Sequence, residues 1–122
     1  MTTKITERIA AWEERQRARL AWAEREVERA YKEKIAAQKW HERCWSRVGR
    51  LEEYIERLER LNDISGEDEI TKAKLTLARD EARRAWITAV RADFRRERAD
   101  NRLRCALTLR NETSFNLGGR DR

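Results

Sequence analysis

The five residues Asn62-Asp63-Ile64-Ser65-Gly66 (NDISG) divide the chain into two long stretches of helix-forming residues. They form the densest cluster of turn-favouring residues before the C-terminal end. Residues 5–61 contain one glycine, and the chain has no proline, so each stretch is predicted to be one helix. A short connection favours antiparallel neighbours. The sequence therefore predicts an all-α protein in which residues 1–110 form one long antiparallel two-helix hairpin, with helices at 5–61 and 67–110 and a turn at 62–66.

A seven-residue spacing predicts how the two helices pack. Two columns of the first helix are predicted to face the core. One holds Leu20, Val27, Lys34, His41, Val48 and Ile55, and the other holds Ile9, Gln16, Ala23, Ala30, Ala37, Cys44, Leu51 and Leu58. The second helix has a column of Ala78, Ala85, Ala92, Ala99 and Ala106. Folding at the turn is expected to place Ala30 opposite Ala99 and Cys44 opposite Ala85. Small residues facing small residues allow a close approach, so we expect a coiled coil with an alanine-rich seam.

The ends of the second helix are predicted from local signals. Ser65 or Gly66 can cap its N-terminus, where the following acids suit the positive end of the helix dipole. Residues 111–122 (NETSFNLGGRDR) are polar, contain paired glycines and show no clear period. We expect them to form a C-terminal tail that is disordered unless it docks on something.

The composition excludes several classes of protein. Of the 122 residues 43% are charged and 39% are apolar, and no run approaches the roughly 18 apolar residues that a membrane span needs. The chain starts directly in a charged helical pattern without an apolar leader, so we expect a cytoplasmic protein, or one within a virion if it comes from a phage. Its two cysteines are expected to be free thiols.

The chain has few of the histidine and cysteine side chains that catalysis or metal binding commonly uses. The single histidine, His41, lies three residues before Cys44, but a zinc site needs further ligands, and Cys105 is far along the chain. Gln38 occupies the position three before His41, so the Glu-x-x-His pattern of di-iron bundles is missing. We therefore predict no enzymatic activity, no cofactor, no metal and no small-molecule substrate. His41 and Cys44 are interpreted as a polar core pair that helps to fix the register.

Apolar residues outside the seam predict a further contact. An alanine seam buries little apolar area, so a lone hairpin would be marginally stable. Ile87, Val90 and Phe94 lie at i, i+3 and i+7 on the side of the second helix that faces away from the alanines, and Ile70 and Leu77 also point largely outward. We expect another helix to pack there, from a second copy or from a different protein, and to form a larger helical bundle.

A basic face interleaved with aromatic residues runs along the first helix. One column holds Arg8, Arg15, Trp22, Arg29, Arg43, Arg50 and Arg57, and the column beside it holds Trp12, Arg19, Trp40, Arg47 and Tyr54. From these we select Trp22, Arg15, Arg43, Arg47 and Arg50 as candidate partner-binding residues, because Trp and Arg are enriched at binding hot spots. The alternative is a solvated surface laced with ion pairs. Trp40, Trp45 and Trp86 are expected to converge near the middle of the hairpin and cover its core.

These patterns predict a non-enzymatic structural or adaptor protein that acts through helix-mediated assembly with itself or with another protein. Arginine outnumbers lysine by 23 to 6, which is typical of GC-rich coding DNA and suits a bacterial or phage assembly component. One alternative is a nucleic-acid-binding accessory protein that uses the Arg and Trp face. Neighbouring glutamates argue against a dedicated DNA binder, because they repel phosphates. A small inhibitor of another macromolecule is a further alternative.

Overall fold

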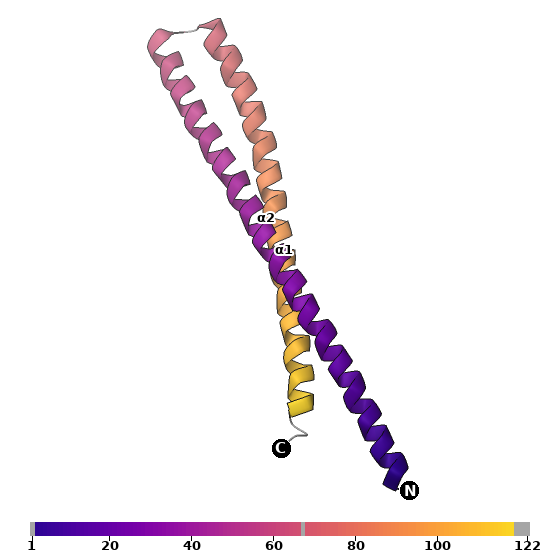
Figure 1. Ribbon diagram of the computed structural model, residues 1–122. Coiled ribbons are helices and arrows are strands. Elements are labelled where there is room, and N and C mark those ends of the chain that lie inside the picture. The colour runs from indigo at the N-terminus through magenta and orange to yellow at the C-terminus, as the bar shows by residue number, and fades with distance from the viewer. Residues whose placement is uncertain (1, 67, 119–122) are drawn as a thin grey trace. The chain divides into compact units, whose positions relative to one another are not determined.

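The protein consists of two α-helices that run in opposite directions from a short connection (Figure 1). The computed structural model describes residues 2–66 and 68–118, and in it α1 spans Thr2–Ser65 and α2 spans Glu69–Gly118. The predicted all-α helical hairpin is confirmed. Neither of these two helices, over the ranges described, contains a segment long and apolar enough to cross a membrane.

Helix α1 continues four residues beyond its predicted end and stops at a glycine. Asn62–Ser65, which were expected to form the turn, are helical, and the Ser65 hydroxyl donates a hydrogen bond of 2.6 Å to the Leu61 carbonyl. Gly66 has a φ of 73°, a left-handed conformation that is favourable for glycine and ends many helices. Among the turn-favouring residues of this cluster, Gly66 alone provides the break.

Asp68, rather than Ser65 or Gly66, caps the N-terminus of α2. Its carboxylate accepts hydrogen bonds from the Ile70 backbone N–H at 3.2 Å and from the Thr71 hydroxyl at 3.0 Å. Its own carbonyl accepts the Lys72 N–H at 3.0 Å. This is the pattern of an N-cap residue, which satisfies donors that the first turn leaves without partners.

The predicted C-terminal tail is helical as far as Gly118, so α2 does not end at residue 110. Thr113 is 2% exposed, and its hydroxyl donates to the Leu109 carbonyl at 2.8 Å. Thr113 lies seven residues after Ala106, and Leu117 lies fourteen after Leu103, so both continue the buried columns of α2. The heptad spacing thus continues through residues 111–118, which were predicted to be a tail because most of them are polar. The rest of the predicted tail, residues 119–122, lies outside the described residues.

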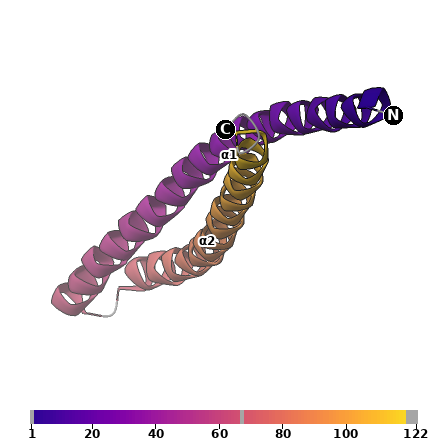
Figure 2. The same ribbon diagram turned by 90° about the horizontal axis from the view of Figure 1, so that it is seen from below.

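The chain forms two compact units, and each is described by itself. The turn unit is Ala36–Glu97, and it contains the connection between the helices. The end unit comprises the described residues up to Ile35 and from Arg98 onwards. Within the turn unit the second part of α1 and the first part of α2 run antiparallel (Figures 1 and 2).

Alanines dominate the core, as predicted, and they pack against both small and large residues of the other helix. The buried apolar residues are Ala23, Ala30, Ala37, Cys44, Val48, Leu58, Leu75, Ala78, Ala85, Ala89, Ala92, Ala99, Leu103 and Ala106. In the end unit, Ala30 of α1 clusters with Leu103 and Ala106 of α2. In the turn unit, Val48 clusters with Ala85 and Ala89, and Leu58 with Leu75 and Ala78. Ala30 thus shares its cluster with a leucine and an alanine of α2, and so does Leu58.

This packing corrects the predicted register. Ala30 meets Leu103, about one helical turn beyond the Ala99 that was expected opposite it. Cys44 meets Ala89 as well as the expected Ala85. The seam therefore keeps its small residues, but α2 is displaced along α1 by about one turn from the predicted alignment.

Ion pairs also connect the two helices within each unit. In the end unit, Arg102 lies 2.7 Å from Glu33 and 3.5 Å from Glu26. In the turn unit, Arg47 lies 3.0 Å from Glu81, and Arg79 lies 3.2 Å from Glu59. Exposed pairs of this kind contribute little energy each, about 0–1 kcal/mol, but they favour one register over its neighbours.

Candidate functional site

His41 and Cys44, the predicted polar core pair, face different neighbours. Cys44 is buried in the turn unit, in a cluster with Val48, Ala85, Ala89 and Ala92 that we call the central apolar cluster. His41 instead pairs with Asp93 of α2. Cys105 is exposed and belongs to the end unit. Across the described ranges 2–66 and 68–118, no group of three or more potential metal-ligating side chains comes together.

A stripe of exposed apolar side chains follows the outer side of α2 in the turn unit. We call Ile70, Leu77, Ile87, Val90 and Phe94 the outer stripe. Leu77 is 69% exposed, Ile70 66%, Phe94 60% and Ile87 42%, and Val90 is partly buried. The structure thus places these residues outside the hairpin core, on the side of α2 away from the buried alanines.

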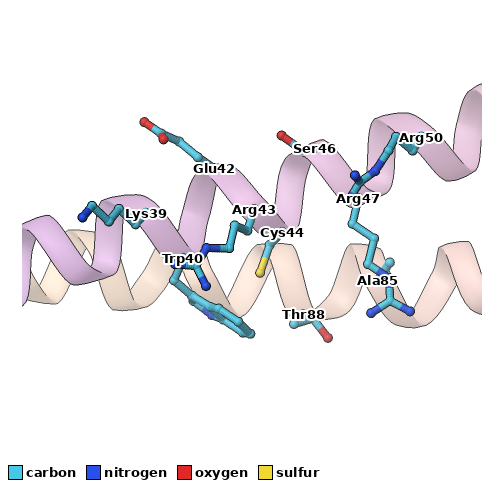
Figure 3. A pocket seen from close by; sticks show the side chains of 10 residues that line it. All are labelled: Lys39, Trp40, Glu42, Arg43, Cys44, Ser46, Arg47, Arg50, Ala85 and Thr88. Atoms are coloured by element: carbon cyan, nitrogen blue, oxygen red, sulfur yellow. The ribbon is translucent and has the colours of Figure 1, made fainter.

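A groove opens between the two helices in the half of the turn unit away from the connection (Figure 3). It has a volume of about 640 Å³. We call it the basic groove, and its lining residues are Lys39, Trp40, Glu42, Arg43, Cys44, Ser46, Arg47, Arg50, Ala85 and Thr88. Four of these carry a positive charge, and one is acidic.

The groove exists because small residues lie between two large ones. Trp40 and Arg47 both reach from α1 across to α2, on either side of Cys44 (Figure 3). Beneath them α2 presents only Ala85 and Thr88, which leave space that larger side chains would fill. The seven-residue spacing of Trp40 and Arg47 places both on the same flank of α1.

The charges around the groove are unevenly compensated. Arg47 is paired with Glu81 of α2 at 3.0 Å. Lys39, Arg43 and Arg50 have no ion pair among the residues that the structure describes. Glu42 points away from α2, on the opposite side of α1 from the Trp40 indole (Figure 3). The groove is therefore basic, with one indole as an apolar wall.

The structure gathers some of the predicted partner-binding residues and separates others. Arg43, Arg47 and Arg50 line the basic groove. Arg15 and Trp22 belong to the end unit, where Trp22 is 49% exposed. They therefore lie outside the groove.

The three tryptophans that were expected to converge on the core have different roles. Trp45 alone packs against the central apolar cluster. Trp86 is 52% exposed, and Trp40 is 41% exposed and forms part of the groove. Sequence reasoning placed Trp40 on the Arg and Trp face but selected neither Trp40 nor Lys39 as a partner-binding residue. The signal was present, since Arg43 follows Lys39 and Trp40 by four and three residues, and Arg47 follows Arg43 by four.

Comparisons of the chain with protein families, with curated proteins and with solved structures found no match.

Proposed function

We propose that this protein is a non-enzymatic structural component that assembles through helix packing, and that its first partner is a second copy of the same chain. The observation that carries this proposal is the outer stripe of α2. The stripe holds four large apolar side chains that are 42–69% exposed and lie on one face. Such a face on a helix is typical of an association surface.

The composition of the core supports the same proposal. Most buried positions are alanines, and burial stabilises in proportion to apolar area, at about 25 cal/mol per Å². Fully burying one large apolar side chain contributes about 1.5–3 kcal/mol. Leu77 and Phe94 remain mostly exposed. Covering the outer stripe would therefore bury more apolar area, and contribute more free energy, than closer packing of the alanine seam.

The charge pattern favours a second copy over an unrelated partner. Asp80 and Arg84 lie between Leu77 and Ile87 on the outer side of α2. Asp80 of one copy can therefore form an ion pair with Arg84 of a second copy. Association of two identical faces is also the commonest form of protein assembly.

The solution mass tests this proposal. Light scattering coupled to size exclusion, at moderate salt, should give at least twice the chain mass of 14.7 kDa at concentrations above the micromolar range, and a mass that falls towards that of one chain below it. Leu77→Asp and Phe94→Asp should return the protein to a monomer while its helix content stays unchanged, because both side chains are exposed. Phe115→Asp is the matched control, since Phe115 is 78% exposed on α2 but lies outside the stripe. A monomer at all concentrations would contradict self-assembly.

The basic groove favours a second candidate function, the binding of single-stranded nucleic acid. Arg43, Arg50 and Lys39 provide positive charges without partners among the described residues, and the Trp40 indole provides a stacking surface. Proteins that bind single strands combine such charges with aromatic platforms.

A further inference from the structure

We infer that two copies of this chain pair α2 against α2 in an antiparallel arrangement, about a two-fold axis level with Ala82. This inference rests on the proposed self-association through the outer stripe. It adds the orientation and the register of the two helices, which the stripe alone does not specify.

The spacing of the apolar residues is the first reason. Ile70, Leu77, Ile87 and Phe94 are separated by seven, ten and seven residues, a pattern that reads the same in both directions along the helix. Turning a second α2 around and centring both on Ala82 places Ile70 opposite Phe94 of the second copy and Leu77 opposite Ile87. The two-fold axis repeats both contacts, as an isologous interface requires.

The charges between these residues are the second reason. In the antiparallel register, Asp80 of each copy lies opposite Arg84 of the other. Arg91 lies opposite Ala73, a small residue that leaves room for the arginine stem to extend to water. In this register, therefore, none of the four residues Ala73, Asp80, Arg84 and Arg91 lies opposite a residue of the same charge.

A parallel arrangement is disfavoured by the same residues. In register, it would place Asp80 opposite Asp80, Arg84 opposite Arg84 and Arg91 opposite Arg91 of the second copy. Three like-charge layers in one short interface oppose association. The apolar layers would match, so charge alone decides against this orientation.

Other antiparallel registers lose apolar contacts. Moving one helix by a heptad places either Leu77 opposite Asp80 or Ile87 opposite Arg84 of the second copy. Only the register centred on Ala82 matches all four large apolar side chains of one copy with those of the other. Burying Asp80 or Arg84 against an apolar partner would cost desolvation without a compensating pair.

The size of the contact predicts modest affinity. Eight large apolar side chains and the stems around them bury on the order of 1,000 Å², the lower limit for a specific interface. We expect a dissociation constant in the micromolar range.

Exchanging the two charges tests the inference on the full-length chain. Asp80→Arg and Arg84→Asp each create two symmetry-related like-charge contacts, and should weaken the dimer about tenfold in sedimentation equilibrium. The double variant Asp80→Arg/Arg84→Asp should restore the wild-type dissociation constant. In a parallel dimer, each single change only replaces one like-charge contact with another, and no weakening followed by rescue is expected.

The control separates the interface from the helix itself, because Asp80 and Arg84 also form a 3.1 Å pair within one turn of α2. Glu56 and Arg60 form an equivalent exposed pair at 3.6 Å on α1, four residues apart. The single and double exchanges at Glu56 and Arg60 should leave dimerisation unchanged. An equal effect at both sites would overturn the inference.

Disulfide trapping gives a second readout that does not depend on the strength of a charge pair. In a Cys105→Ser background, chains carrying Asp80→Cys are mixed with chains carrying Arg84→Cys and oxidised. Antiparallel pairing predicts mostly mixed disulfides between the two variants, whereas parallel pairing predicts that each variant links to itself. A dimer that gives self-linked products would overturn the register and leave self-assembly standing. A wild-type monomer would overturn both proposals.

Discussion

The His41 Nε2 atom lies 2.6 Å from Asp93 Oδ1, and this contact joins the two helices at the end of the turn unit away from the connection. The same oxygen accepts a hydrogen bond of 2.8 Å from the Trp45 indole N–H. The His41 and Trp45 rings lie 6.4 Å apart at an angle of 59°, so they approach Asp93 from successive turns of α1. One carboxylate of α2 thus holds two large side chains of α1, and it specifies the register more directly than the interchangeable alanines beside it.

Removing this carboxylate should destabilise the protein. Asp93→Ala leaves the partly buried Trp45 N–H and the His41 Nε2 atom without their partner, and we expect a loss of about 1–2 kcal/mol in the free energy of unfolding. Urea unfolding followed by circular dichroism measures this loss, at one fixed protein concentration because assembly would add stability. Glu28→Ala, which removes an exposed 3.4 Å pair with Lys32, is the control and should change stability by less than about 0.5 kcal/mol. Equal effects of the two variants would show that Asp93 has no special role.

Replacing Gly66 and Gly49 by alanine should change the stability of the protein in opposite directions. Gly66 has a φ of 73°, so Gly66→Ala should destabilise by about 1 kcal/mol. Gly49 lies inside α1, and a Cβ added there meets nothing within 4 Å. Gly49→Ala should therefore stabilise by about 0.5–1 kcal/mol. Thermal unfolding of the two variants beside the wild type measures both changes, and two shifts of the same sign would contradict this account of the connection.

The alanine seam should not tolerate a larger side chain. Ala92 is 0% exposed in the central cluster, so Ala92→Leu should cost about 1–3 kcal/mol through overpacking. Ala36→Leu places the same change at an exposed position of α1 in the same unit, and should be close to neutral. Denaturant midpoints of the two variants provide the comparison. Little difference between them would indicate that the helices pack less closely than the buried alanines imply.

Binding of single-stranded nucleic acid should depend on the basic groove and on salt. Titration of a fluorescent single-stranded oligonucleotide should give an affinity that falls steeply as salt rises, because phosphate binding releases counterions. Arg43→Glu should reduce the affinity and flatten the salt slope, and Trp40→Ala should remove a stacking contribution of about 1–3 kcal/mol.

Two controls accompany this titration. Phe94→Asp, on the outer stripe, should leave nucleic-acid binding nearly unchanged, and Arg43→Glu should leave the dimer intact. An affinity that Arg43→Glu does not alter would exclude the groove as a nucleic-acid site. If an acidic peptide bound there while the oligonucleotide did not, the groove would be a protein contact instead.

The sequence by itself determined the two helices and which faces of them are buried. Periodicity does this locally, because residues seven apart return to the same side of a helix whatever lies opposite. Gly66 and the run of helix-forming residues on both sides of it made the hairpin predictable, and the seven-residue columns correctly placed Ala30, Cys44 and Ala85 in the core. The outward position of Leu77 and Phe94 followed from the same columns.

The tertiary structure decided how the two helices are aligned along their axes. Alanine recurs every seventh residue in both seams, so the sequence alone offers several registers of nearly equal merit, and the predicted one differed by about a turn. The choice depends on contacts between residues far apart in the chain, such as Trp45 with Asp93 and Arg102 with Glu33. The basic groove also arises only from this alignment, because Trp40 and Arg47 enclose a space only where α2 presents Ala85 and Thr88 opposite them.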